Sequence, residues 1–310
     1  MGMFKLVLLT LADLKLGVQT VRLAGSLAAR HGAGFAVQHV SGPLGQEGGC
    51  VLHLPGEVEL AARRTEVESL CRVAMPPGLT ADVMLSAGFV HVEVLKTARL
   101  LEPDLLILGG LDEAERCHRE LTGAAAAAAL RIAATASCPV LVVPAEAHMP
   151  SVPFQRILAV TDLSDSAEAV LDVAARLAAS EGSALRAFHA LPQPLAEAAS
   201  LEPVLERARE RLAYLGRGLP LQSPLDLAVR EGDPAVEILK DARESEADLL
   251  VLASACYGQE ASVPGRVLDG ARCPVLFVGP QALTSLSRPA AAQPTATTTT
   301  TAASTADARG

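Results

Sequence analysis

The sequence predicts an α/β protein of two tandem domains, each a doubly wound sheet of five parallel strands covered by helices. Its 310 residues are about twice the length of a typical domain of roughly 150 residues, so each half is long enough to bury a core. The chain also repeats itself: Leu27 to His39 resembles Leu177 to His189, and Cys138 to Val143 resembles Cys273 to Val278. Within each copy, short apolar runs alternate with segments of helical period, which is typical of strand–helix–strand crossovers.

The repeat also predicts how the chain is divided. We place the first domain at residues 1–146, a linker at 147–155 and the second domain at 156–281. Residues 282–310 are rich in Ala, Thr, Ser and Pro and contain almost no large apolar side chain. Such a segment cannot offset the entropy cost of ordering, so we expect a disordered tail.

The first domain opens on an apolar run, Met3 to Ala12, which we interpret as a buried strand. A secretory signal peptide is the alternative, but the only basic residue of the run is Lys5 and no clear cleavage site follows. Near the end of this domain, the run Ala124 to Ala129 predicts the start of the last helix, because alanine is the best helix former.

The second domain repeats the pattern more clearly. Its apolar runs predict strands at 156–161, 185–190, 225–229, 249–253 and 275–278. The helix after the first strand has Asp165 as a candidate cap and an apolar stripe at Val170, Val173, Ala174, Leu177 and Ala178. The helix after the third strand has a strong start signal, in which Asp233 is the N-cap and Pro234 the first helical residue.

Charge and composition exclude several classes of partner. The 26 basic and 35 acidic residues give a net charge of −9, which provides no basic field for nucleic acid, and only 3% of residues are aromatic. No run reaches the ~18 apolar residues that cross a bilayer. The six cysteines form no C-x-x-C pair, which favours a reducing compartment over a disulfide framework. We therefore expect a cytoplasmic protein without a nucleic-acid or membrane partner.

A set of motifs resembles the universal stress protein family. They are Thr161-Asp162 at the end of one strand, His189 at the end of the next, Gly-Asp-Pro from Gly232, Ala-Asp-Leu-Leu-Val-Leu from Ala247, and Cys-Pro-Val-Leu-Phe-Val from Cys273. The resemblance covers nearly the whole chain outside the tail, as a tandem of two such domains. It implies an adenine-nucleotide-binding α/β fold with strand order 3-2-1-4-5, pairing of the domains through their last strands, and a role in stress endurance.

Nucleotide-binding members of that family carry G-x-x-G-x(9)-G-[ST] after the fourth strand, where glycines let the backbone approach the phosphates. In the first copy the motif survives as a remnant. Glu113 takes the middle glycine position, Ala124 replaces the hydroxyl residue, and the remaining glycines are Gly109, Gly110 and Gly123. The resemblance therefore implies an eroded ATP site in this copy.

The second copy departs from the same motif, because Ala253 stands at the first glycine and the following loop is short. It keeps an acidic residue, Asp162, at the position that recognises the nucleotide in the family, where we place Leu11 of the first copy. The resemblance makes the second copy the better candidate for a retained ligand, with Asp162, Ser254 and Ser262 as contacts. Two alternatives stay open: Asp162 as a turn carboxylate bonded to nearby amides, and Ser262 as an ordinary N-cap before Pro264.

Other groupings carry less weight. We interpret His91 as a structural histidine on a buried helix stripe, with a catalytic base as the alternative. The cluster Ser164-Asp165-Ser166 lacks the turn motif and the partner histidine of a catalytic triad. Soft metal ligands occur only as two pairs where zinc needs four ligands, namely Cys50 with His53 and Cys117 with His118. The sequence thus predicts neither a metal site nor catalytic residues.

We expect a non-enzymatic or ligand-regulated stress-response factor with an eroded nucleotide site. The alternative is an ATP-binding stress protein with slow hydrolysis, and a small pocket-based enzyme comes third because it needs a convergent acid–base pair. The partners we expect are a small-molecule ligand and the other domain of the same chain, through the strands Val140 to Val143 and Val275 to Val278. Association with a second copy of the chain is left open.

The tail yields a first prediction. Deleting residues 284–310 should change the melting temperature by less than about 2 °C, because a segment without apolar side chains adds no packing to the fold. Differential scanning calorimetry of the full and shortened chains measures this. A loss of several degrees would contradict the prediction and show that the tail docks on a domain.

Overall fold

The structure is a computed structural model. It describes residues 2–12, 14, 17–41, 56–109, 122–144, 147, 154–164, 166–192, 202–254 and 262–282. Asp165, Gly110 and residues 283–310 of the expected tail lie outside these residues, as do Cys50, His53, Cys117 and His118. Ala282, which we placed at the start of the tail, is buried against the fold.

Ten strands form one continuous sheet, in the order β3-β2-β1-β4-β5-β10-β9-β6-β7-β8. The first half contributes β1 (Leu6–Leu11), β2 (Gly34–Ser41), β3 (Asp82–Ala87), β4 (Leu105–Gly109) and β5 (Val140–Val142). The second half contributes β6 (Arg156–Val160), β7 (Ala184–Leu191), β8 (Asp226–Glu231), β9 (Leu249–Ala253) and β10 (Val275–Val278). Each half is parallel and has the expected order 3-2-1-4-5, so the predicted fold class is confirmed.

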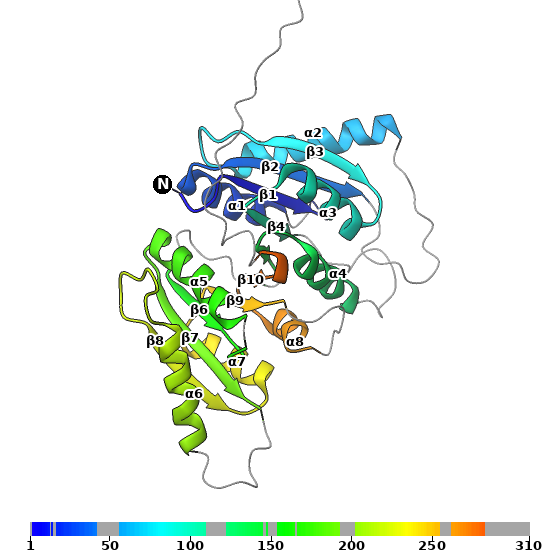
Figure 1. Cartoon of the computed structure of the whole chain (residues 1–310). Coiled ribbons are helices and arrows are strands. Elements are labelled where there is room, and N and C mark those ends of the chain that lie inside the picture. The colour runs from blue at the N-terminus through cyan, green and yellow to red at the C-terminus, as the bar shows by residue number, and fades with distance from the viewer. Residues whose placement is uncertain are drawn as a thin grey trace, which may run out of the picture.

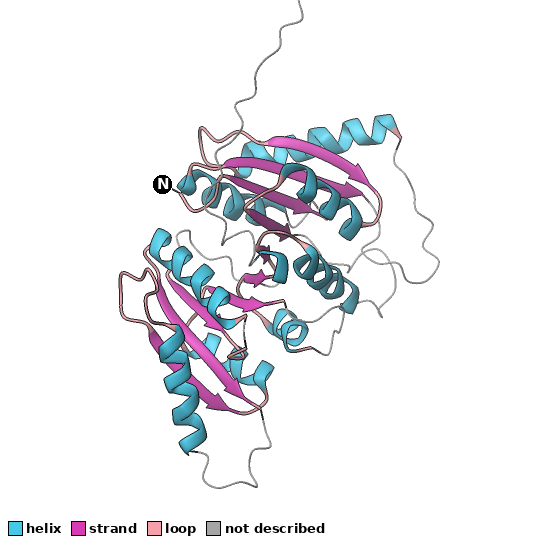
Figure 2. Ribbon diagram, viewed as in Figure 1, coloured by secondary structure: helices cyan, strands magenta, loops and turns pink. Residues whose placement is uncertain are grey.

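Helices cover both faces of the sheet (Figure 2). One face carries α1 (Gly17–His31), α2 (Glu57–Ala74), α5 (Ala167–Glu181) and α6 (Glu202–Leu215). The other carries α3 (Val90–Leu101), α4 (Thr122–Thr135), α7 (Pro234–Glu244) and α8 (Val263–Gly270). Between sheet and helices lie two apolar cores, one on each face, and each core contains residues of both halves.

The structure corrects the alignment of the two copies by one residue. Asp104 accepts hydrogen bonds from the amides of Lys5 and Leu6, and Asp248 accepts them from those of Gln155 and Arg156. The pairing of Leu6 with Arg156 places Ala12, and not Leu11, opposite Asp162 in the repeat. The alignment on Thr10 and Thr161 was wrong because Thr10 lies inside β1, whereas Thr161 follows β6. Ala12 also lacks a carboxylate.

The two halves meet where β5 and β10 pair antiparallel at the centre of the sheet (Figure 1). Leu141 lies opposite Leu276, and the flanking pairs are Val142 with Val275 and Val140 with Phe277. Because Leu141 and Leu276 are equivalent residues of the repeat, a pseudo-twofold axis passes between them. The pairing covers two apolar edge strands, each of which would otherwise be open to uncontrolled association.

This pairing generates a second prediction. In the double variant Val142→Asp/Phe277→Asp, two carboxylates replace fully buried side chains, so we expect Tm to fall by about 10 °C or more and the radius of gyration to rise. Small-angle scattering and calorimetry measure the two effects. The control is Val58→Asp/Leu100→Asp, at side chains that are 86% and 80% exposed, and it should behave like the parent protein. Unchanged dimensions and stability in the first variant would contradict the prediction.

The cysteines generate a third prediction. Cys138 and Cys273 are buried core residues, and burial raises the pKa of each thiol to about 12. At pH 8 only about one thiol in ten thousand is then the reactive thiolate. A disulfide reagent should leave both cysteines unmodified in the native protein and modify them after unfolding, as peptide mass spectrometry would show. Modification of either one within minutes in the folded protein would refute this.

Candidate functional site

The candidate site lies at the carboxyl edge of the second half. There β6 has β9 on one side and β7 on the other. The chain crosses over in opposite directions from these two neighbours, and ligands of open α/β sheets bind at such a switch point. Asp162 follows β6 and Ser254 follows β9, so adjacent strands bring these two predicted residues to the same edge.

A tight turn after β6 positions Asp162. The amide of Leu163 donates to Thr161 Oγ1 and the amide of Ser164 donates to Asp162 Oδ1, both at 3.0 Å. Leu163 adopts a left-handed backbone with φ of 62°, which a branched residue rarely does. Asp162 therefore has the turn role held open above. Asp162 is at the same time exposed at the carboxyl edge of the sheet.

His189 fixes the end of β7 to the end of β6. Its Nδ1 lies 2.8 Å from the carbonyl oxygen of Thr161. A carbonyl only accepts hydrogen bonds, so Nδ1 carries a proton and donates it to this carbonyl. The first half repeats the contact between His39 Nδ1 and the Leu11 carbonyl at 2.9 Å, but there Nε2 also contacts Ser41 Oγ at 3.3 Å.

Ser254 contributes to the contact between the halves. Its side chain is buried, and Oγ donates to the carbonyl oxygen of Ala133 on α4 at 3.0 Å. Nearby, a Cβ at Gly279 would lie 2.4 Å from the same carbonyl, so only glycine allows this close approach. The single hydroxyl proton of Ser254 is therefore used by the first half of the chain.

Ser262 is the N-cap of α8, and its Oγ accepts from the Gly265 amide at 3.3 Å. This is the capping role that we held open for it. The neighbouring helix α7 is capped by Asp233, which accepts from the Val236 amide and pairs with Arg266 at 2.9 Å. Hydrogen bonding to Arg266 lowers the pKa of Asp233 below its ordinary value.

The first half is different at the corresponding edge. Leu11 is fully buried in the core, and Ala12 occupies the place of Asp162. Gly109 ends β4 against α1, where an added Cβ would lie 2.4 Å from Thr20 Cγ2, so packing alone accounts for this glycine. Gly123 is the second residue of α4. No carboxylate among the described residues of this half stands where Asp162 does.

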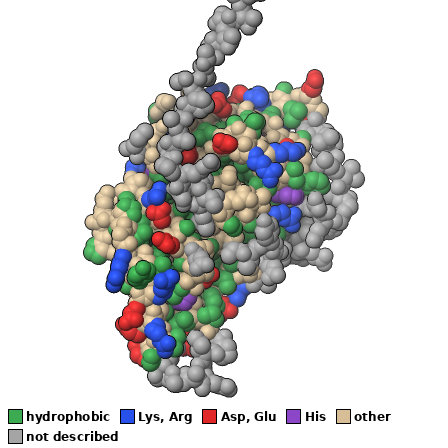
Figure 3. All heavy atoms as spheres, viewed as in Figure 1, with side chains coloured by type: hydrophobic (Ala, Val, Ile, Leu, Met, Phe, Trp, Pro, Cys, Tyr) green, Lys and Arg blue, Asp and Glu red, His purple; other side chains and the backbone are tan. Residues whose placement is uncertain are grey.

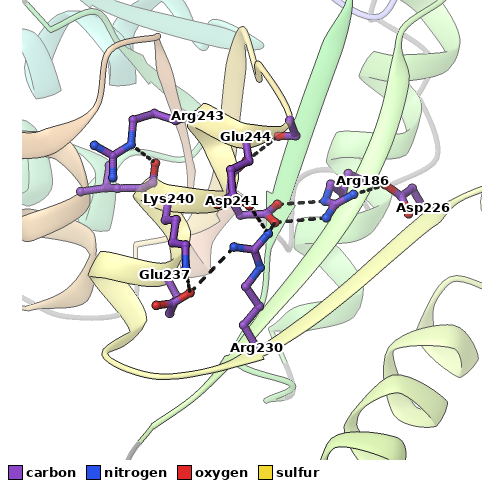
Figure 4. A network of polar contacts seen from close by, with 10 residues as sticks. Arg186, Asp226, Arg230, Glu237, Lys240, Asp241, Arg243 and Glu244 are labelled. Atoms are coloured by element: carbon purple, nitrogen blue, oxygen red, sulfur yellow. Dashed lines mark hydrogen bonds and ion pairs between the residues drawn. The ribbon is translucent and has the colours of Figure 1, made fainter.

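A charged cluster on the second half was missed by the sequence analysis (Figure 4). Asp241 on α7 is fully buried and pairs with Arg186 on β7 at 2.9 Å and with Arg230 on β8 at 2.7 Å. The signal that could have revealed it is Asp241 itself, because a charged residue stands on the buried stripe of α7 that includes Ile238. The cluster joins α7 to the sheet. Its carboxylates neutralise both arginines, which argues for a structural role.

The remaining sequence interpretations concern metals, membranes and His91. Among the described residues, no three His, Cys, Asp or Glu side chains are grouped to hold a metal ion. None of the helices in the described ranges is long and apolar enough to cross a membrane. His91 is buried on α3, with its ring centroid 6.3 Å from that of Phe89. Basic and acidic side chains are interspersed on the face seen in Figure 3.

Comparison with known proteins finds a family match for the second half and solved structures with the fold of the whole chain. Residues 153–279 match the model of the universal stress protein family. A putative universal stress protein from Pseudomonas aeruginosa UCBPP-PA14 shares 16% identity with a TM-score of 0.61, over 92% of this chain and 96% of its own. A universal stress protein from Archaeoglobus fulgidus DSM 4304 shares 15% identity with a TM-score of 0.61, over 88% of this chain and 96% of its own. No curated protein matches the chain.

Both structural neighbours span nearly the full tandem, so the fold of the whole chain is the one they share. The family match adds a relationship in sequence for the second half, which includes Asp162, His189, Ser254 and Ser262. Residues 153–279 therefore belong to the universal stress protein family, and the first half of the chain has the same fold.

Proposed function

We propose that this protein is a ligand-regulated stress-response factor of the cytoplasm, not an enzyme, in which only the second half retains a small-molecule site. The ligand class is an adenine nucleotide, held weakly. The first half serves as the structural partner of the second.

The observation that carries the proposal is the difference between the two carboxyl edges. In the second half, Asp162 is exposed directly after β6, and the buried His189 near the end of the neighbouring strand β7 holds the Thr161 carbonyl that precedes it. The Asp162 carboxylate accepts hydrogen bonds, and the hydroxyls of a ribose donate them. The first half keeps the equivalent histidine, His39, but Leu11 and Ala12 provide no carboxylate, which supports the loss of recognition there.

The phosphate side of the site supports weak binding. Ala253 stands where a family glycine would let the backbone approach a phosphate, and the hydroxyl of Ser254 is engaged by Ala133. At the start of α8, the Gly265 amide donates to Ser262 Oγ, so this amide is not available to bind an anion. These features together favour a nucleotide held mainly through its nucleoside part.

A second candidate function is ATP binding with slow hydrolysis. Asp162 favours it, because the same exposed carboxylate would hold a nucleotide that is hydrolysed as well as one that is only bound. This candidate requires steady release of phosphate from ATP, whereas the proposed function requires none.

The fourth prediction tests both candidates on the full chain. Calorimetric titration with ATP should reveal at most one site per chain, with a dissociation constant weaker than about 100 μM, and no hydrolysis above the buffer rate. Asp162→Asn should weaken this binding about tenfold, because it removes a charged acceptor. The control Asp172→Asn, on α5 and paired with Arg176 at 2.9 Å, should leave it unchanged.

Three results would count against the proposal. Two sites per chain would mean that the first half binds as well. Micromolar binding that survives Asp162→Asn would remove this carboxylate from the site. Measurable turnover would favour the ATP-hydrolysing alternative.

A further inference from the structure

Two equivalent residues of the repeat meet across the pseudo-twofold axis, and they differ in chemistry. His31 is the last residue of α1, and Glu181 is the last residue of α5. His31 Nε2 lies 3.1 Å from Glu181 Oε1, with side chains that are only 3% and 1% exposed. The other carboxylate oxygen, Oε2, accepts from Arg30 Nε at 3.0 Å.

The first half fixes which nitrogen of His31 faces the second half. The amide nitrogen of Met3 donates to Nδ1 at 3.1 Å. The ring of Phe4 packs edge-on against the imidazole, with 4.7 Å between the two ring centroids. Because Nδ1 accepts, the proton of the ring lies on Nε2 and faces the Glu181 carboxylate. The N–H is not aimed well enough for a hydrogen bond, so the contact is chiefly electrostatic.

We propose that the buried contact of Arg30 and His31 with Glu181 makes the interface heterotypic, so that a first half accepts only a second half as its partner. An axis of this kind brings equivalent residues together. Two second halves would bury one Glu181 carboxylate against another, with Ser180 in place of Arg30 beside each. Two first halves would set the Nε2 protons of His31 against each other beside two arginines. Only the mixed pair sets the Nε2 proton of His31 beside a carboxylate and pairs the Arg30 cation with that anion.

The opposite face of the sheet supports the same inference independently. There the Ala133 carbonyl approaches Gly279 so closely that a Cβ would lie 2.4 Å away. The residue equivalent to Gly279 in the first half is Pro144, which has a Cβ. Two first halves in this geometry would therefore set Pro144 against the partner's Ala133 carbonyl, at a place where a Cβ has no room.

The experiment compares two full-chain variants of nearly the same shape. His31→Gln keeps an amide donor opposite Glu181, whereas His31→Glu opposes two buried carboxylates. We expect Tm to fall by about 2 °C or less for His31→Gln and by about 6 °C or more for His31→Glu, with a larger radius of gyration only in the latter. The control Glu66→Gln breaks the exposed pair of Arg63 and Glu66 and should change neither quantity.

The exchanged variant His31→Glu/Glu181→His tests complementarity directly. It keeps one acid and one imidazole across the axis, so it should recover at least half of the stability lost in His31→Glu. Equal losses for His31→Gln and His31→Glu would show that size and burial alone matter, and would overturn the proposal. An exchanged variant no more stable than His31→Glu would overturn it as well.

Discussion

The antiparallel pairing of β5 with β10 is the constraint on which the rest of this structure depends. Each half ends in an apolar strand at the edge of its own parallel sheet, and these two strands share hydrogen bonds at the centre of the ten-stranded sheet. Both apolar cores continue past this point from one half into the other. The pairing thus removes two exposed edges and joins two modest cores into larger ones, which is how a duplicated domain of this size gains stability.

The copies have diverged in how they hold the same helix. In the second half, Asp241 on α7 is neutralised by arginines of β7 and β8. In the first half, the equivalent helix α3 is joined to the sheet by neutral groups, since Gln38 Nε2 donates to Ser86 Oγ at 3.0 Å and to Thr97 Oγ1 at 2.9 Å. Both networks satisfy buried polar groups. A fold of this kind accepts either chemistry at the same place, provided that every donor and acceptor is paired.

Much of the fold follows from local signals in the sequence. The cap at Asp233, the apolar stripe of α5 and the closing Val-Leu-Phe-Val strand are short-range patterns with a direct physical cause, and the structure contains each of them. The alignment of β1 with β6 failed by one residue, because a shared threonine is weaker information than the backbone hydrogen bonds to Asp104 and Asp248.

The candidate site was less predictable. Asp162 and Ser254 could be placed at one edge of the sheet from the strand order. That Ser254 would donate to Ala133 depends on contact between residues 121 positions apart, and nothing in the local sequence indicates it. The pairing of His31 with Glu181 could not be predicted from the local sequence for the same reason. Equivalent positions of a repeat become neighbours only when the two halves associate, so their difference in charge has no visible meaning within either copy.

The central position of β10 also affects how the protein is made. β5 is complete once residue 142 has been synthesised, but its partner ends at residue 278, 136 residues later. At about 5–20 residues per second, the edge of β5 stays uncovered on the ribosome for roughly 7–27 seconds. A long apolar edge would be hazardous for that time, whereas β5 has only three residues. The shortness of this strand therefore protects the nascent first half until the end of the chain arrives to complete the sheet.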